Sequence, residues 1–107
     1  MDKDETFSLG GIKSMEKYLL GIDVGTSSCK VAVFDEVGKV IAQASESYPV
    51  YYPHHGWAEQ DPLDWWEAIC SCTKNIFAEG LVKPEDIAGI GIDGQSWSAI
   101  ALDQERN

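Results

Sequence analysis

Residues 21–30, Gly-Ile-Asp-Val-Gly-Thr-Ser-Ser-Cys-Lys, constrain the fold more than any other part of the 107-residue chain. The apolar residues at 18–22 and at 31–34 are typical of strands, so the stretch between them predicts a hairpin turn. One glycine and three hydroxyl residues lie in this turn. We expect Gly25 to permit close approach and a positive φ, and successive amides of such a turn form an anion-binding concavity.

The turn has two interpretations. It is either an ordinary tight hairpin with a solvated Asp23, since glycine is common in turns, or a phosphate-binding site. In the second interpretation Asp23, at the end of a buried strand, holds Mg²⁺ directly or through water.

Net charge, apolar runs and cysteines exclude several classes of protein. The net charge is −10, which argues against non-specific binding to nucleic acid or to anionic membranes. No run approaches the roughly 20 apolar residues of a transmembrane helix, and the acidic first residues do not resemble a signal peptide. We therefore expect a cytoplasmic protein, in which Cys29, Cys70 and Cys72 are reduced packing residues.

The first half of the chain predicts a small sheet. Residues 1–17 have weak patterning, and we expect a flexible N-terminal extension there. Residues 18–23, 29–34 and 39–47 predict a three-stranded meander, with a polar turn at residues 35–38. One face of this sheet needs a helix to cover it.

A helix is predicted directly after this sheet. Asp61 is a good N-cap, Pro62 suits the first helical position, and Gly80 suits a left-handed C-cap. Apolar residues recur between them at three- and four-residue spacing. The face expected to pack on the sheet consists of Trp66, Ile69, Thr73 and Phe77.

Residues 48–60, before the helix, form an aromatic loop that contains two prolines. The loop either packs over the sheet edge or forms one wall of a sugar pocket, because sugars stack their C–H faces on aromatic rings. Trp57 would belong to that wall. His54 and His55 have no further ligands beside them, so a solvated loop is preferred over a metal site.

After the helix, residues 87–93 predict a strand parallel to the first. Its Gly89 and Gly91, with Gly94, match the dinucleotide fingerprint G-x-G-x-x-G, but no helical pattern follows them. We expect these glycines to make room for the helix or for close backbone approach instead. Residues 99–102 predict a last strand.

Residues 103–107 predict a turn like that at residues 35–39. A domain that stops at a turn is expected to be a fragment of a longer protein.

Three separated blocks resemble the FGGY carbohydrate kinases, members of the actin, hexokinase and Hsp70-like ATPase superfamily. They are residues 21–30, residues 56–62 (Gly-Trp-Ala-Glu-Gln-Asp-Pro) with a tryptophan pair beyond, and residues 87–92 leading into Gly94-Gln95. The Glu-Gln-Asp-Pro sequence is most similar to the xylulokinase branch. The resemblance implies an α/β, ribonuclease H-like (actin-like ATPase) core, a truncated mixed sheet with a crossover helix, in which residues 18–107 are the N-terminal portion of the first kinase domain.

The resemblance also implies site residues. Asp23 matches the magnesium-associated aspartate, and Gly25, Thr26 and Ser27 match the loop that meets the terminal phosphates of ATP. The residues expected to contact the sugar are Gln95, Ser96, Trp97 and Trp57. After the glutamine the chain departs from the Met-His of xylulokinases and the Arg-Glu of glycerol kinases, so the sugar stays open.

The implied activity is phosphorylation of a sugar hydroxyl by ATP with Mg²⁺, with a pentulose such as xylulose as the expected substrate. The catalytic base and the second lobe would lie beyond position 107, so no catalytic residue is assigned and the fragment alone is expected to be inactive. A homodimer is one assembly open to the full-length parent.

Two other functions compete with this one. A non-catalytic nucleotide- or sugar-binding module of the same superfamily is the first, and Trp57 and Trp97 near Gln95 favour a sugar kinase over it. A nuclease that uses Asp23 and Asp93 as a two-metal pair is the second. The net charge of −10 and the lack of a basic face argue against the nuclease.

Overall fold

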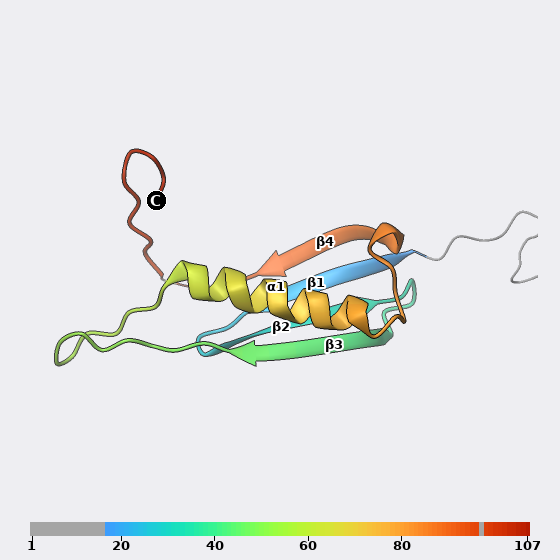
Figure 1. The fold of residues 1–107 in the computed structure, drawn as a ribbon, viewed down its shortest axis with the longest axis horizontal. Coiled ribbons are helices and arrows are strands. Elements are labelled where there is room, and N and C mark those ends of the chain that lie inside the picture. Colours follow the sequence, from blue (N-terminus) through green and yellow to red (C-terminus); the bar gives the residue numbers. More distant parts are fainter. Residues whose placement is uncertain (1–16, 97) are drawn as a thin grey trace, which may run out of the picture.

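The computed structural model describes residues 17–96 and 98–107, which form one mixed four-stranded sheet with a long helix across one face (Figure 1). The elements are β1 (Tyr18–Val24), β2 (Ser28–Phe34), β3 (Val40–Ser47), α1 (Pro62–Ala78), the 3₁₀ turn η1 (Pro84–Asp86) and β4 (Ile87–Asp93). The extension expected at residues 1–17 lies, apart from Lys17, outside the described residues, and so does Trp97. No helix in the described part of the chain is long and apolar enough to cross a membrane.

The strands lie in the order β3-β2-β1-β4. β1, β2 and β3 form an antiparallel meander, while β4 returns through α1 to pair in parallel with β1. This arrangement confirms the predicted meander, crossover helix and parallel strand. In its register Asp23 of β1 is the partner of both Lys30 of β2 and Asp93 of β4.

The ends of α1 are set by local capping, as the sequence predicts. The Asp61 carboxylate accepts a hydrogen bond of 2.9 Å from the Leu63 amide, and Pro62 is the first helical residue. Gly80 has φ of 80°, and its amide donates to the Phe77 carbonyl just after the last turn.

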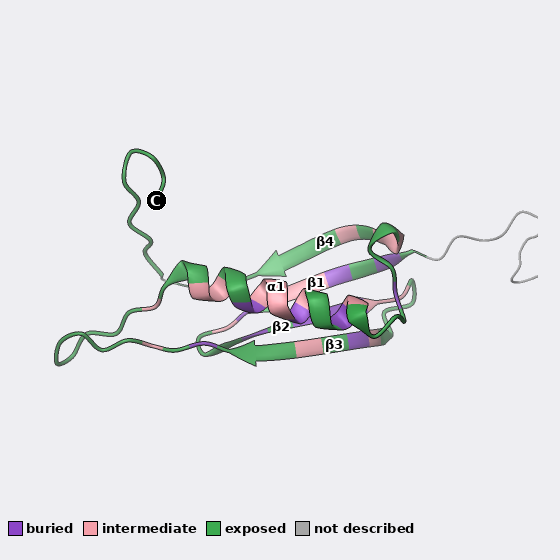
Figure 2. Ribbon diagram, in the orientation of Figure 1, coloured by how far each residue is buried: buried purple, intermediate pink, exposed green. Residues whose placement is uncertain are grey.

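The helix is rotated relative to the predicted packing face. Its buried residues are Ala68, Cys72 and Ile76, with Trp65, Ile69 and Phe77 partly buried beside them. Trp66 is 63% exposed, so its predicted burial is wrong. Thr73 is half-buried and donates its hydroxyl hydrogen to the Ile69 carbonyl. Two of the buried residues, Ala68 and Cys72, are small, which suits close packing of α1 against β2 and β3. Figure 2 shows buried segments recurring along α1 between exposed ones.

Two further expectations for the C-terminal part are wrong. Residues 99–102 form no strand; they leave the sheet without a strand partner, and Ile100 is 54% exposed (Figure 1). Gly91 does not make room for the helix, because nothing lies within 4 Å of the position of an added Cβ. At Gly89 such a Cβ would lie 3.3 Å from the Leu19 side chain, a contact within the sheet.

The two acidic turns are built alike, as predicted. Asp35 and Asp103 each accept two backbone amide hydrogen bonds through one carboxylate oxygen, from the residues two and four positions further on. In both turns the amide of the first residue also donates to the carbonyl of the fifth. The turn is therefore encoded by its aspartate and does not require flanking strands.

Candidate functional site

The turn between β1 and β2 is held through its backbone carbonyls. The Gly25 amide donates to the Ser28 carbonyl at 2.9 Å, and the Tyr48 amide donates to the Ser27 carbonyl at 3.0 Å. The buried Tyr48 also directs its hydroxyl at the carbonyls of Gly25 and Ser28. Burial, with lesser contributions from Cys29 and Asp23, raises the pKa of Tyr48, which keeps this hydroxyl a donor at neutral pH.

Two glutamines complete this support. Gln60, just before α1, donates from Nε2 to the Thr26 carbonyl at 2.6 Å. Gln95, just after β4, donates from Nε2 to the Gly25 carbonyl at 2.9 Å. All four carbonyls of residues 25–28 are thus occupied, while the Thr26 and Ser27 amides have no acceptor within residues 17–96 and 98–107. The carbonyl oxygens of this turn accept hydrogen bonds from the protein, while two of its amides are left to donate to a ligand. Such a turn suits an anion.

Gly25 is required by space in this turn. An added Cβ would lie 2.9 Å from the Ser28 carbonyl oxygen, which is backbone and cannot swing aside. This contact lies within the loop, and the expected close approach of a ligand at Gly25 stays a prediction. The expected positive φ is wrong, because the left-handed glycines are Gly38, Gly56 and Gly80.

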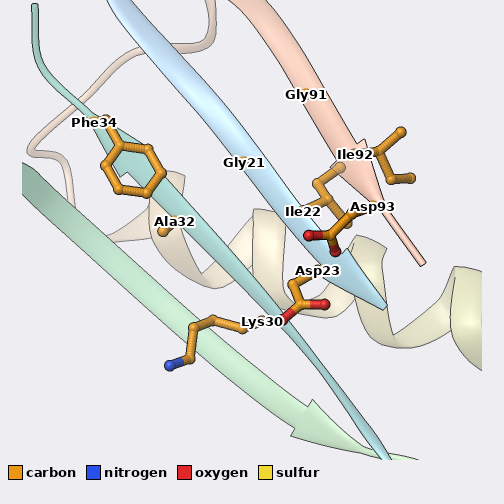
Figure 3. A pocket seen from close by; sticks show the side chains of 9 residues that line it. All are labelled: Gly21, Ile22, Asp23, Lys30, Ala32, Phe34, Gly91, Ile92 and Asp93. Atoms are coloured by element: carbon orange, nitrogen blue, oxygen red, sulfur yellow. The ribbon is translucent and has the colours of Figure 1, made fainter. Parts of the chain in front are cut away.

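Two carboxylates meet beside the loop, at the carboxyl ends of the parallel strands β1 and β4. Asp23 and Asp93 are register partners, and their carboxylates lie next to each other (Figure 3). A hydrogen bond with Asp23, its charge and some burial raise the pKa of Asp93 above the ordinary carboxyl value. The Lys30 side chain extends away from the pair (Figure 3).

The same carboxylates border an open hollow of about 390 Å³ on the face opposite α1 (Figure 3). The residues that line it are Gly21, Ile22, Asp23, Lys30, Ala32, Phe34, Gly91, Ile92 and Asp93. The hollow exists because two paired residues of the sheet, Gly21 and Gly91, have no side chains to fill the space above it. Phe34 packs over Gly21, where an added Cβ would lie 3.0 Å from the ring.

The candidate metal ligands at this position are two carboxylates. Asp23 and Asp93 offer hard carboxylate ligands, the type that Mg²⁺ prefers. The described residues contain no group of three or more His, Cys, Asp or Glu that could hold a metal ion. The donor set therefore fits an ion that keeps several waters and takes other ligands from a phosphate, which is the usual behaviour of Mg²⁺.

The structure brings together only some of the residues predicted to contact sugar. Gln95 lies at the loop, and Ser96 follows it as an exposed residue. Trp57 is 55% exposed, and its ring meets His54 edge-on at 4.6 Å in the loop that projects past the sheet (Figure 1). Neither a hydrogen bond nor a ring contact joins Trp57 to Gln95 among the residues the structure describes.

Sequence reasoning missed three residues that support the site. Tyr48 lies at the start of the aromatic loop in the sequence, yet its hydroxyl faces two carbonyls of the turn. Trp65 donates its indole hydrogen to Gln60, which in turn holds the Thr26 carbonyl. The signal for Gln60 was its place in the Glu-Gln-Asp-Pro block, where the aspartate and proline were already assigned to the helix start.

Two cysteines lie in the core behind the loop. The Cys29 and Cys72 sulfurs are 3.8 Å apart, and both side chains are 1% exposed. Burial and the contact with Cys29 raise the pKa of Cys72 to about 12. The expectation that all three cysteines are free is confirmed.

Comparisons with known proteins agree on one family. Residues 18–107 match the model of the N-terminal domain of the FGGY family of carbohydrate kinases. Glycerol kinase 2 of Thermotoga maritima is 41% identical over 88 residues, which are 82% of this chain and 18% of that protein.

Solved structures match the fold as well. The gluconate kinase of Lactobacillus acidophilus superimposes with a TM-score of 0.76 at 30% identity, over 86% of this chain and 18% of that one. The xylulose kinase of the same species, with ligand bound, gives 0.75 at 31% identity, over 85% and 18%. The chain spans about a fifth of the length of these relatives.

Proposed function

We propose, from the premise that the chain belongs to the FGGY family of carbohydrate kinases, that it supplies the phosphate-binding part of an ATP-dependent kinase for a hydroxyl group of a small carbohydrate. The observation that carries the proposal is the loop of residues 25–28, whose carbonyls are all held from within the protein. Its remaining amides, on Thr26 and Ser27, suit the oxygens of a terminal phosphate. The sheet would be the beginning of a ribonuclease H-like core.

Each residue has a proposed task. Gly25 lets the turn close, while Thr26 and Ser27 add hydroxyl groups to the available amides. Asp23, with Asp93 beside it, would hold Mg²⁺ through water or directly. Bound Mg²⁺ neutralises charge on the phosphate oxygens. The chain itself would position and orient the terminal phosphate of ATP. Positioning and charge neutralisation supply most of the rate enhancement in phosphoryl transfer.

The catalytic base and the second lobe are proposed to lie beyond position 107. Accordingly, residues 1–107 alone should release no ADP in a sugar-dependent manner above a protein-free control. Clear turnover that Asp23→Ala abolishes would contradict this expectation.

The phosphate site itself can be tested on the 107-residue chain by ¹⁵N NMR. Adding ATP with Mg²⁺ should shift the amide resonances of Thr26 and Ser27, whereas adenosine, which lacks phosphates, should not. Gly25→Ala should abolish the shift, because its Cβ meets the Ser28 carbonyl at 2.9 Å. Leu81→Ala is the control, since Leu81 is 61% exposed and lies outside the loop and the hollow. Equal shifts with adenosine would refute the site.

The substrate is a finer question. The sequence resemblance favours a pentulose such as xylulose, while the curated relatives at 35–41% identity include several glycerol kinases. We keep xylulose as the proposed acceptor and glycerol as its rival. Comparing kcat/KM for D-xylulose and glycerol in the protein that contains this chain separates them, and a clear preference for glycerol would overturn the pentulose proposal.

A non-catalytic nucleotide- or sugar-binding module is the second candidate. The structure does not join Trp57 to Gln95, so the sugar wall that favoured a kinase rests on the resemblance. Binding of ATP without phosphorylation of any polyol by the longer protein would favour this module. We further propose that the protein is cytoplasmic and binds neither nucleic acid nor membranes. We also propose that its full-length parent forms a homodimer.

A further inference from the structure

We infer that Trp65 and Gln60 are positioning residues, which fix the side-chain amide of Gln95 so that only its oxygen is left to meet a ligand. The hydrogen-bond path begins at the Trp65 indole, which donates to Gln60 Oε1 at 3.2 Å. Gln95 Nε2 donates to the same oxygen at 2.9 Å. Gln60 Nε2 then donates to the Thr26 carbonyl of the phosphate loop.

The chemistry of the partners dictates both amide orientations. An indole N–H is only a donor, so the Gln60 atom that faces it must be the oxygen. The Thr26 carbonyl is only an acceptor, so the opposite Gln60 atom must be the nitrogen. A flipped Gln60 would set donor against donor at Trp65 and acceptor against acceptor at Thr26. Gln95 is fixed in the same way, between Gln60 Oε1 and the Gly25 carbonyl.

This orientation limits what Gln95 can recognise. Its Nε2 has two hydrogens, and the Gly25 carbonyl and Gln60 Oε1 take both. Its Oε1 accepts one bond of 3.1 Å from the exposed Ser98 hydroxyl and has a second lone pair. Resting on the proposed function, Gln95 therefore takes a hydroxyl hydrogen of the acceptor substrate and would repel a carboxylate or keto oxygen in that position.

The same bonds couple the two halves of the site. Gln95 holds the Gly25 carbonyl and Gln60 holds the Thr26 carbonyl, so a displacement of either amide also displaces the phosphate loop. Substrate hydroxyl recognition and phosphate placement thus share one rigid support, which originates 35 residues before Gln95 in the chain.

The chain offers a matched pair of variants. Trp65→Phe removes the indole donor and keeps an aromatic ring, while Trp66→Phe makes the same change at a neighbour that is 63% exposed. In ¹⁵N spectra, Trp65→Phe should shift the side-chain amide resonances of Gln60 and Gln95, and Trp66→Phe should not. Trp65→Phe should also weaken ATP–Mg²⁺ binding about three- to tenfold, the effect of losing one neutral hydrogen bond.

Unmoved Gln60 and Gln95 resonances in folded Trp65→Phe would overturn the inference, whether or not the chain binds ATP. Lack of ATP binding by the unmodified chain would instead refute the proposed function alone. If Trp65→Phe does not fold, Gln60→Glu serves in its place. It keeps an acceptor for Trp65 and Gln95 but sets an oxygen against the Thr26 carbonyl, so the Thr26 and Ser27 resonances must move; if they do not, the inference is wrong.

Discussion

Replacing Tyr48 by phenylalanine removes one hydroxyl that faces two carbonyl oxygens of the loop at residues 25–28. A hydroxyl has a single hydrogen, so the two contacts together are worth about one neutral hydrogen bond, roughly 0.5–1.5 kcal/mol. The ring stays in place, since Tyr48 is only 6% exposed. Neither carbonyl loses every partner, because Gln95 still donates to Gly25 and the Gly25 amide still donates to Ser28.

Urea unfolding of the two proteins, followed by circular dichroism, measures this loss as a shift in midpoint at constant slope. Tyr52→Phe is the control, because Tyr52 is 73% exposed, and it should leave the midpoint unchanged. A loss above roughly 3 kcal/mol would mean that a buried carbonyl has been left without a donor, and the described network would then be incomplete. No loss at all would mean that the hydroxyl does not hold the loop.

Three other predictions concern the core and the carboxylates. Ile76→Ala should destabilise the fold by about 2–5 kcal/mol in the same assay, because Ile76 is a fully buried residue of α1, whereas Leu81→Ala, at an exposed position, should have little effect. Folding raises the pKa of Cys72 from 9.0 to about 12, so the stabilisation from its protonated thiol should be complete below pH 9 and decrease between pH 9 and 12. Urea unfolding across that range should show the decrease, and Cys72→Ala should remove it. A hydrogen bond with Asp23 and the Asp23 charge raise the pKa of Asp93, so ionised Asp93 is unfavourable in the folded protein at neutral pH. Asp93→Asn should therefore raise the unfolding midpoint at neutral pH, and an unchanged midpoint would show that the two carboxylates do not interact.

Local structure followed closely from the sequence. Asp61 and Pro62 set the start of α1, Gly80 its end, and Asp35 and Asp103 their turns, because each acts through hydrogen bonds to residues at most four positions away. The strand order was predictable only in part. Both edge strands of the meander, β1 and β3, run in the same direction, so a strand that returns through a helix can pair in parallel with either, and the structure pairs β4 with β1.

Which face of α1 packs on the sheet could not be predicted from the sequence. Trp66 and Ala68 lie on different sides of the helix, and apolar periodicity allows either to face the sheet. Close packing against β2 and β3 selected the side with small residues, so Trp66 became exposed. Similarly, residues 99–102 have the composition of a strand, but a strand also needs a pairing edge.

The residues alone predict a turn at residues 25–27 and place Asp23 at the end of a strand, but they leave open whether the turn is an ordinary hairpin or a phosphate site. How that turn is held depends on the fold. Its supports come from residues 23, 34 and 70 positions away in the chain, namely Tyr48, Gln60 and Gln95. A side-chain hydrogen bond to a distant carbonyl has no periodicity or local motif, because it exists only when packing brings donor and acceptor within about 3 Å.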